Sequence, residues 1–208
     1  MKVLITHEES QTVMEAFLLA GHDAYSCDLL PCSGKYPERH LQMDCFEAIK
    51  LIKPDFLGMH PECTRLTVTA NKWYKPEYSE RFSNIHKERA QAVEHFLECA
   101  EAVRIIGKGY LENPIGIMSS KYRKPEQIVQ PYQFGSPTRK ATCLWLFGLP
   151  KLTPTNIVAH EVYTFKSGAT MSMEHYKSAS LPKEERRKKR SVTFPGIAQA
   201  MAKQWGLL

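Results

Sequence analysis

Short apolar runs alternate along the chain with segments in which apolar residues recur every three or four positions. The runs lie at residues 2–6, 23–28, 55–59, 109–113 and 142–147, and each has the length of a buried strand. Strands that alternate with helices are typical of a mostly parallel sheet with helices on both faces. We therefore expect an α/β protein with this architecture.

Three segments have the apolar spacing of helices. Residues 8–20 place apolar side chains on one helical face, and Gly21 follows at the position of a C-terminal cap. Residues 79–106 predict a long amphipathic helix, and the final segment, 195–208, regains the same spacing. These helices lie between or after the predicted strands, as the architecture requires.

Two stretches, 113–138 and 148–182, hold several prolines and little periodicity, so we predict that they are irregular. A chain of 208 residues suffices for one domain with a sizeable core. We expect a single domain over residues 1–208, with residues 148–190 as an irregular, basic insert.

The charge of the chain is positive, at +6, and part of the excess is concentrated in "KEERRKKR" (183–190), which has six bases and two acids. Such a run is either a solvated helix or loop, or a segment that contacts phosphates. In the second reading the candidate phosphate-binding residues are Arg186, Arg187, Lys188, Lys189 and Arg190.

Targeting signals are not apparent. No apolar run approaches the roughly 20 residues that a membrane-spanning helix needs. The start, "MKVLITHEES", is too short and too soon acidic for a signal peptide. The six cysteines form no C-x-x-C pair and are expected to be reduced and mostly buried. We therefore expect a cytoplasmic protein with no membrane partner.

Polar side chains follow four of the predicted strands. In open α/β sheets, ligands bind beyond the carboxyl ends of the strands. The residues at these positions are His7, Glu8, Glu9, Ser10, Gln11, Asp28, His60, Cys63, Thr64, Glu112 and Asn113. Cys63 and Glu112 are the two that can act in covalent chemistry.

Cys63 has three possible roles: packing, metal binding and nucleophilic attack. Zinc deaminases use H-x-E followed by P-C-x-x-C, and "HPEC" (60–63) is not followed by that second motif, so no metal site is predicted. A thiolate can add to an electron-poor ring carbon when an acid orients or protonates the ring. Cys63 with Glu112 would suit covalent addition to a pyrimidine.

Several strings resemble the motifs of DNA (cytosine-5) methyltransferases, in the same order. "PECTRLTVTAN" (61–71) resembles the nucleophile loop and "LENP" (111–114) the Glu-Asn-Val motif. "FGSPTRKATCLWL" (134–146) resembles the segment that carries the family arginines, and "SVTFPGIAQAMAKQW" (191–205) the closing helix. Residues 3–31 have the strand–helix–Gly–strand–acid layout of the cofactor half. More closely, nearly the whole chain resembles the compact phage-type DNA cytosine methylases.

The resemblance implies a Rossmann-like class I methyltransferase fold and a reaction on DNA. Cys63 would attack C6 of a cytosine, Glu112 would bond N3 and the exocyclic amine, and Arg139 would hold the base or its phosphate. The activated C5 would take a methyl group from the cofactor, S-adenosylmethionine. The base would have to leave the stack to reach these groups.

The resemblance also implies how the cofactor and the DNA are held. The segment from His7 to Gln11 would wrap the methionine end, Asp28 would bind the ribose and Asp44 the adenine. The candidate cofactor-binding residues are His7, Glu8, Glu9, Ser10, Gln11, Asp28, Asp44 and His60. The candidate DNA-contacting residues are Thr64, Asn113, Lys140 and the basic residues of 183–190.

Each of these residues also has a structural alternative. Asp28 and Asp44 could be helix N-caps. Glu112 could cap a turn or pair with a base, and Arg139 or Lys140 could be a surface charge. Trp145 and Trp205 are expected in the core rather than under a base.

Three departures from the family pattern stand out. The first loop, "THEESQT", has no glycine, although close approach of backbone to cofactor favours one. Glu62 precedes Cys63 where proline is usual, and an adjacent carboxylate raises a thiol pKa. Only about 45 residues separate Trp145 from Ser191, which leaves little room for reading a DNA sequence. We expect low specificity, a very short target or a partner protein that supplies specificity.

Two other functions stay open. A pyrimidine-nucleotide-modifying enzyme of the same fold would need no recognition domain. A non-catalytic nucleic-acid-binding or anti-defence protein is favoured by the loop without glycine, whereas Cys63, Glu112 and Arg139 favour an enzyme.

Overall fold

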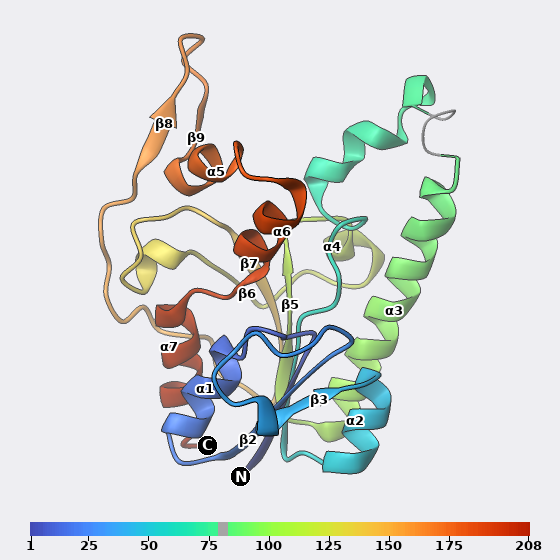
Figure 1. The fold of residues 1–208 in the computed structure, drawn as a ribbon, viewed down its shortest axis with the longest axis vertical. Coiled ribbons are helices and arrows are strands. Elements are labelled where there is room, and N and C mark those ends of the chain that lie inside the picture. Colours follow the sequence, from blue (N-terminus) through green and yellow to red (C-terminus); the bar gives the residue numbers. More distant parts are fainter. Residues whose placement is uncertain (79–82) are drawn as a thin grey trace.

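A seven-stranded sheet forms the centre of the computed structural model, which describes residues 1–78 and 83–208 (Figure 1). In spatial order its strands are β3 (His40–Gln42), β2 (Asp23–Asp28), β1 (Lys2–Thr6), β4 (Phe56–Met59), β5 (Gly109–Pro114), β7 (Thr142–Phe147) and β6 (Gln127–Val129). β7 is antiparallel to both of its neighbours, and the other pairs are parallel. The predicted Rossmann-like α/β fold with a mostly parallel sheet is confirmed.

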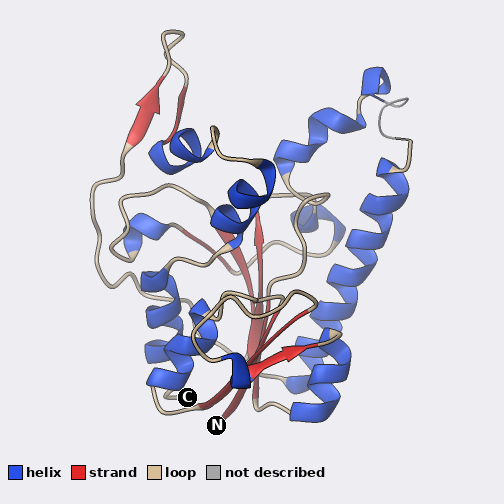
Figure 2. Ribbon diagram, in the orientation of Figure 1, coloured by secondary structure: helices blue, strands red, loops and turns tan. Residues whose placement is uncertain are grey.

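Helices cover both faces of this sheet (Figure 2). α1 (Thr12–Leu19) and α7 (Pro195–Trp205) lie together on one face, and α2 (Cys45–Ile52) and α3 (Ile85–Ile106) lie on the other. The sheet therefore has two separate cores. The first, with α1 and α7, includes Val3, Ile5 and Trp205, and the second, with α2 and α3, includes Leu4 and Trp145. The alternation of Val3, Leu4 and Ile5 between the two cores follows from the two-residue period of a strand.

β4, in the middle of the sheet, is apolar throughout because both of its faces are covered. All four residues of β4 are buried. Gly58 is the one residue of β4 without a side chain, and its neighbours fill the space that a side chain would need. A Cβ there would lie 2.7 Å from the Tyr110 ring and 2.8 Å from Ile5.

Most predicted elements are present, with differences at their ends. The strand at 142–147 has the predicted bounds, and the helix predicted at 8–20 begins at Thr12 because the residues before it form the loop after β1. The helix predicted at 79–106 is seen over Ile85–Ile106, and residues 79–82 of that prediction lie outside the described residues. Trp145 and Trp205 are both buried, as predicted.

The short elements β3, α2 and β6 were not predicted. The stretch 113–138, expected to be irregular, also contains α4 (Met118–Lys121). Short 3-10 turns occur at Pro37–Arg39, Val68–Tyr74, Pro76–Tyr78 and Pro131–Gln133. β3, β6 and α4 have only three or four residues each, which is too few for a periodic pattern to identify an element.

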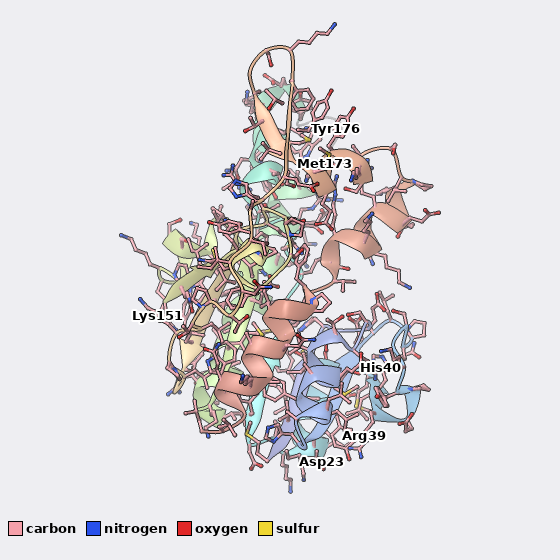
Figure 3. The ribbon with its side chains drawn as sticks, turned by 90° about the vertical axis from the view of Figure 1, so that its left-hand side faces the viewer. Asp23, Arg39, His40, Lys151, Met173 and Tyr176 are labelled. Carbon is pink, nitrogen blue, oxygen red and sulfur yellow. The ribbon has the colours of Figure 1, made fainter. Side chains whose placement is uncertain are left out.

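The insert 148–190 is more ordered than its composition suggests. Its first part has no regular element, and it then forms the hairpin β8 (Val162–Thr164) and β9 (Thr170–Ser172), followed by α5 (Met173–Ser178) and α6 (Lys183–Ser191). Tyr176 of α5 stacks on Tyr163 of β8, with ring centres 3.6 Å apart. Figure 3 shows Tyr176 beside the hairpin. This contact joins the hairpin to α5, which lies above the carboxyl ends of the parallel strands (Figure 1).

The helix α3 has 22 residues, and charged side chains interrupt its apolar residues. Within residues 1–78 and 83–208, no helix is both long enough and apolar enough to cross a membrane.

Trp205 is the largest anchor of the face covered by α7, and its loss should be costly. It is fully buried, its ring centre lies 5.3 Å from that of Tyr110, and its indole N–H donates to the Pro150 carbonyl at 2.9 Å. We expect Trp205→Ala to lower the free energy of unfolding by about 3–5 kcal/mol in urea denaturation. Trp205→Phe keeps most of the apolar contact and should cost less; equal losses would show that packing is not the main contribution.

Candidate functional site

Cys63 and Glu112 come together because β4 and β5 are parallel neighbours. Met59, at the end of β4, pairs with Leu111 of β5, so the chain leaves both strands at the same edge of the sheet. Cys63 and Glu112 are both half-buried there. Glu112 acts electrostatically on Cys63, since its carboxylate raises the pKa of the Cys63 thiol.

The thiol of Cys63 is protonated in the resting protein. Burial is the main cause of its pKa of about 11, and the charge of Glu112 adds to it. Glu62 acts in the same direction, as expected from the sequence, but with a smaller effect than Glu112. The Glu62 carboxylate is exposed and accepts a hydrogen bond from the Thr64 hydroxyl at 2.8 Å. A ligand that neutralises Glu112 would therefore favour the thiolate.

Lys140 is the cation of this site. It lowers the pKa of Cys63 and of Glu112, although burial keeps the pKa of Glu112 above its ordinary value. The hydroxyl of Thr142, on β7, also bonds Glu112. Arg139, predicted to be the catalytic base-holding residue, is exposed, whereas Lys140 is half-buried. The structure thus gives Lys140 the position that the sequence prediction gave to its neighbour.

Lys140 also joins the site to the insert. Its ammonium donates to the carbonyl of Arg190 at 2.7 Å, and its backbone N–H donates to the Gln130 side chain at 3.0 Å. The ammonium lies 5.6 Å from the centre of the Phe194 ring. α6 is therefore held against the edge that carries Cys63.

The five candidate cations of 183–190 divide into two groups. Arg186 donates to the Ala179 carbonyl at 3.1 Å, and Arg190 donates to Ser178 and to the His175 carbonyl at 2.9 and 3.0 Å. These two arginines hold α5 and α6 together. The other three are exposed, and they are Arg187, Lys188 and Lys189.

Asn113, predicted to contact DNA, instead holds the loop that carries Cys63. Its side-chain amide is buried and donates to the Pro61 carbonyl at 2.7 Å. Further along, Ile117 N–H donates to the Leu66 carbonyl at 2.9 Å, and a Cβ on Gly116 would lie 2.2 Å from that same oxygen. The segment after β5 thus fixes the backbone on both sides of Cys63.

The loop after β1 takes left-handed backbone conformations without glycine. His7 has φ 57° and Gln11 has φ 60°, values that are uncommon for residues with a side chain. The Gln11 side chain offsets this by donating to Ser26 at 3.1 Å and by bonding both backbone groups of Tyr36 at 2.8 Å. The missing glycine is therefore compatible with an ordered loop.

Glu8 caps α1 from within the protein. Its two carboxylate oxygens accept the N–H groups of Val13 at 2.6 Å and Met14 at 3.1 Å. These are donors at a helix N-terminus, which have no partner inside the helix. Burial nevertheless raises the pKa of Glu8 to about 7.

The other candidate cofactor residues differ in how far they are engaged. Asp28 is half-buried at the end of β2, and one of its oxygens accepts Leu30 N–H at 2.9 Å. Asp44 is the N-cap of α2, which was the structural alternative for it. His60 is held by the Tyr110 hydroxyl at 2.8 Å, and burial lowers its pKa to about 3.

These residues fit a ribose-bearing ligand in part. The order of the strands reverses at β1, so the loops after β1 and β4 flank the crevice in which such sheets bind ligands. Asp28, at the end of β2, can accept bonds from ribose hydroxyls there. Glu9 and Ser10 are half-buried on the loop after β1, where the Glu9 carboxylate accepts a hydrogen bond from the Ser33 hydroxyl. The side chains of Glu8, Gln11 and Asp44 are engaged by the protein itself, so S-adenosylmethionine would be held by Asp28 and by loop backbone rather than by the whole predicted set.

The sequence reasoning missed a cluster of four metal-binding side chains. One atom from each of His7, Cys45, His95 and Cys99 lies within 4.8 Å of the others. The side chains of Cys99 and Cys45 share a hydrogen bond. This hydrogen bond lowers the pKa of Cys45 and raises the pKa of Cys99. The local signal was the four-residue spacing of His95 and Cys99 on a predicted helix; His7 and Cys45 are too far away in sequence to be associated with them.

The chain was compared with families and with characterised proteins. No protein-family model matches it, and no curated protein matches its sequence.

Replacing Glu112 should change the reactivity of Cys63 in a predictable direction. Glu112→Gln removes a charge that raises the thiol pKa, so alkylation of Cys63 by iodoacetamide at pH 8 should become faster, about tenfold for each unit by which that pKa falls. Lys140→Gln should have the opposite effect, and Glu62→Gln a smaller acceleration. Mass spectrometry of the Cys63 peptide measures the rates; slower labelling in Glu112→Gln would contradict this account.

The pKa of Glu8 predicts how stability depends on pH. Folded Glu8 holds its proton up to pH 7, whereas an unfolded chain releases it near the ordinary value of 4.5. Folded Glu8 therefore binds more protons within this window, and its contribution to the slope of the free energy of unfolding against pH is negative, about 1.4 kcal/mol lost per unit in mid-window, whereas His60, whose pKa is lowered, contributes a slope of the opposite sign.

Glu8→Gln should remove this slope, as measured by urea denaturation between pH 4.5 and 8. Glu38→Gln, at an exposed acid outside the loop, is the control and should keep the slope. An unchanged slope in Glu8→Gln would assign the pH dependence to other groups.

Proposed function

We propose that the protein is an S-adenosylmethionine-dependent DNA methyltransferase that modifies C5 of cytosine through a covalent adduct of Cys63. The observation that supports this most is the grouping of Cys63, Glu112 and Lys140 at the edge formed by the carboxyl ends of β4 and β5 and the amino end of β7. A thiol, a carboxyl group with a raised pKa and one cation are the groups that addition to a pyrimidine requires.

Glu112 would activate the ring. Its raised pKa favours a carboxyl group that can donate a proton to N3, which makes C6 electron-poor. Before it donates the proton, the carboxyl group carries no negative charge and does not hinder ionisation of the Cys63 thiol. After donation, the new carboxylate is paired with the protonated N3.

Cys63 would then lose its proton to solvent, and its thiolate would form a bond with C6. The electron pair of the C5–C6 double bond moves toward N3, and C5 becomes nucleophilic. S-adenosylmethionine, when bound, would supply the methyl group that C5 takes and would leave as S-adenosylhomocysteine. The proton of C5 then passes to solvent, the C6–S bond breaks to release the thiolate, and N3 returns its proton to Glu112, which restores the aromatic ring and the carboxyl group.

Lys140 would stabilise the anionic stages. It already lowers the pKa of Cys63 and of Glu112. Its ammonium is fixed by the Arg190 carbonyl, so its charge is in place before the substrate arrives. Such preorganised charge is what stabilises a transition state most effectively.

DNA would be held by the exposed cations of α6. Arg187, Lys188 and Lys189 are free of the contacts that engage Arg186 and Arg190, and lysine and arginine bind phosphates without reading bases. α6 lies next to the catalytic edge through Lys140. This supports DNA binding with low sequence specificity. A partner protein is the alternative source of specificity.

A non-catalytic nucleic-acid-binding protein of the same fold is the second candidate. It is favoured by the side chains of Glu8 and Gln11, which are engaged by the protein itself rather than available to a cofactor. Calorimetric titration with S-adenosylmethionine and S-adenosylhomocysteine separates the two candidates, because only the enzyme should bind them.

Cys63→Ala should abolish methylation. We expect the wild-type protein to form 5-methylcytosine in duplex DNA incubated with S-adenosylmethionine, as measured by mass spectrometry of the nucleosides, and the variant to form none. Cys32→Ala is the matched control, because Cys32 is also half-buried but lies outside the site. Persistent 5-methylcytosine formation by Cys63→Ala would eliminate the covalent mechanism, and parallel reactions with single strands and free dCMP test the nucleotide-modifying alternative.

A further inference from the structure

The side chains of His7, Cys45, His95 and Cys99 converge from three separate elements. His7 directly follows β1, Cys45 is the first residue of α2, and His95 and Cys99 lie one turn apart on the same face of α3. Cys45 and Cys99 are buried, and the two histidines are half-buried. These four side chains lie at the face of the sheet covered by α2 and α3, and Cys63 and Glu112 are not among them.

We propose that His7, Cys45, His95 and Cys99 form a tetrahedral zinc site. Zinc in structural sites is bound by four cysteine or histidine ligands, with Zn–S near 2.3 Å and Zn–N near 2.0–2.1 Å. Tetrahedral ligand atoms at those bond lengths lie about 3.3–3.8 Å apart. Here the two histidine Nε2 atoms are 3.0 Å apart, and Cys99 Sγ is 3.6 Å from His95 Nε2. The remaining ligand atoms lie within 4.8 Å of one another, so changes of about 1 Å or less in these separations would bring the four to coordination distances.

Both histidines have partners on the ring nitrogen that faces away from the cluster. The Nδ1 of His7 lies 3.0 Å from the Thr6 hydroxyl, and the Nδ1 of His95 lies 3.9 Å from a carboxylate oxygen of Glu98. Histidine ligands of metals commonly use one nitrogen for the metal and the other for an oxygen partner. This arrangement turns both Nε2 atoms toward the sulfurs.

The donor set selects the class of metal. Two thiols and two imidazoles suit zinc, whereas calcium and magnesium require oxygen ligands, of which the cluster has none. Four protein ligands complete a tetrahedral shell and leave no position for a substrate, so the site is structural. A groove of about 1010 Å³ runs along α3 and is lined in part by Phe46 and Glu98, which are the chain neighbours of Cys45 and Cys99.

A metal here would fix the loop after β1. His7 has an uncommon left-handed backbone, and coordination would hold its ring against α3. α2 and α3 would be joined to the same ion. The role does not depend on methyl transfer, so it can be tested whether or not the protein acts on DNA.

Metal content and cobalt spectroscopy test the site in the full chain. Purified without a histidine tag, the protein should contain about one zinc per chain by elemental analysis. Cobalt(II) exchanged into it should show thiolate-to-cobalt charge-transfer absorption and the intense visible bands of a tetrahedral ion. Cys99→Ser should weaken zinc binding at least tenfold and reduce the charge-transfer band, whereas Cys32→Ser should retain both.

Stability gives a second readout. A strong chelator should lower the melting temperature of the wild-type protein and of Cys32→Ser but not that of Cys99→Ser. Less than one tenth of a zinc per chain after refolding with excess zinc would overturn the proposal, as would a cobalt spectrum without thiolate bands. A Cys45–Cys99 disulfide, seen as four rather than six titratable thiols after denaturation, would also overturn it. If Cys99→Ser does not fold, the wild-type cobalt spectrum decides.

Discussion

The parallel pairing of β4 with β5 brings Cys63 and Glu112 together at one edge of the sheet. A parallel pair brings two carboxyl ends to the same edge, and the register of Met59 with Leu111 places the two exits side by side. Cys63 and Glu112 are more than forty residues apart in sequence, yet they interact because of this pairing. The antiparallel strand β7 then brings Lys140 to the same edge from the opposite direction. The site thus depends on backbone pairing before it depends on any side chain.

The loop after β1 has a backbone conformation that is typical of glycine, and hydrogen bonds within the protein stabilise it. Left-handed backbone at His7 and Gln11 is costly, on the order of 1 kcal/mol or more at each position, and persists only where the surroundings fix it. Glu8 supplies part of that support by capping α1, and Gln11 supplies another part through Ser26 and Tyr36. The consequence is a loop with two side chains that serve the fold and little freedom to rearrange around a ligand.

The sequence predicted the elements whose pattern is long or fully apolar, and the pair at the sheet edge. The strand at 142–147 has an unbroken apolar run, and the rule for carboxyl ends led to Cys63 and Glu112 without coordinates. The catalytic role was predicted for Arg139, whereas Lys140 is the half-buried residue of the two, because adjacent residues face different sides of the chain. The bond between Asn113 and the loop of Cys63 was not predicted, because its partner, a backbone carbonyl of Pro61, has no sequence signature. The His7 cluster was missed because its members belong to three elements, and one of these, α2, was not predicted.

The bond between Lys140 and the carbonyl of Arg190 makes the site sensitive to the position of α6. That carbonyl belongs to the same short helix that presents Arg187, Lys188 and Lys189 to solvent. Lys140 lowers the pKa of the Cys63 thiol, so a movement of α6 that shifted the ammonium would change that pKa. A polyanion that bound the exposed cations, as proposed for DNA, would thus act on the acidity of Cys63 through α6.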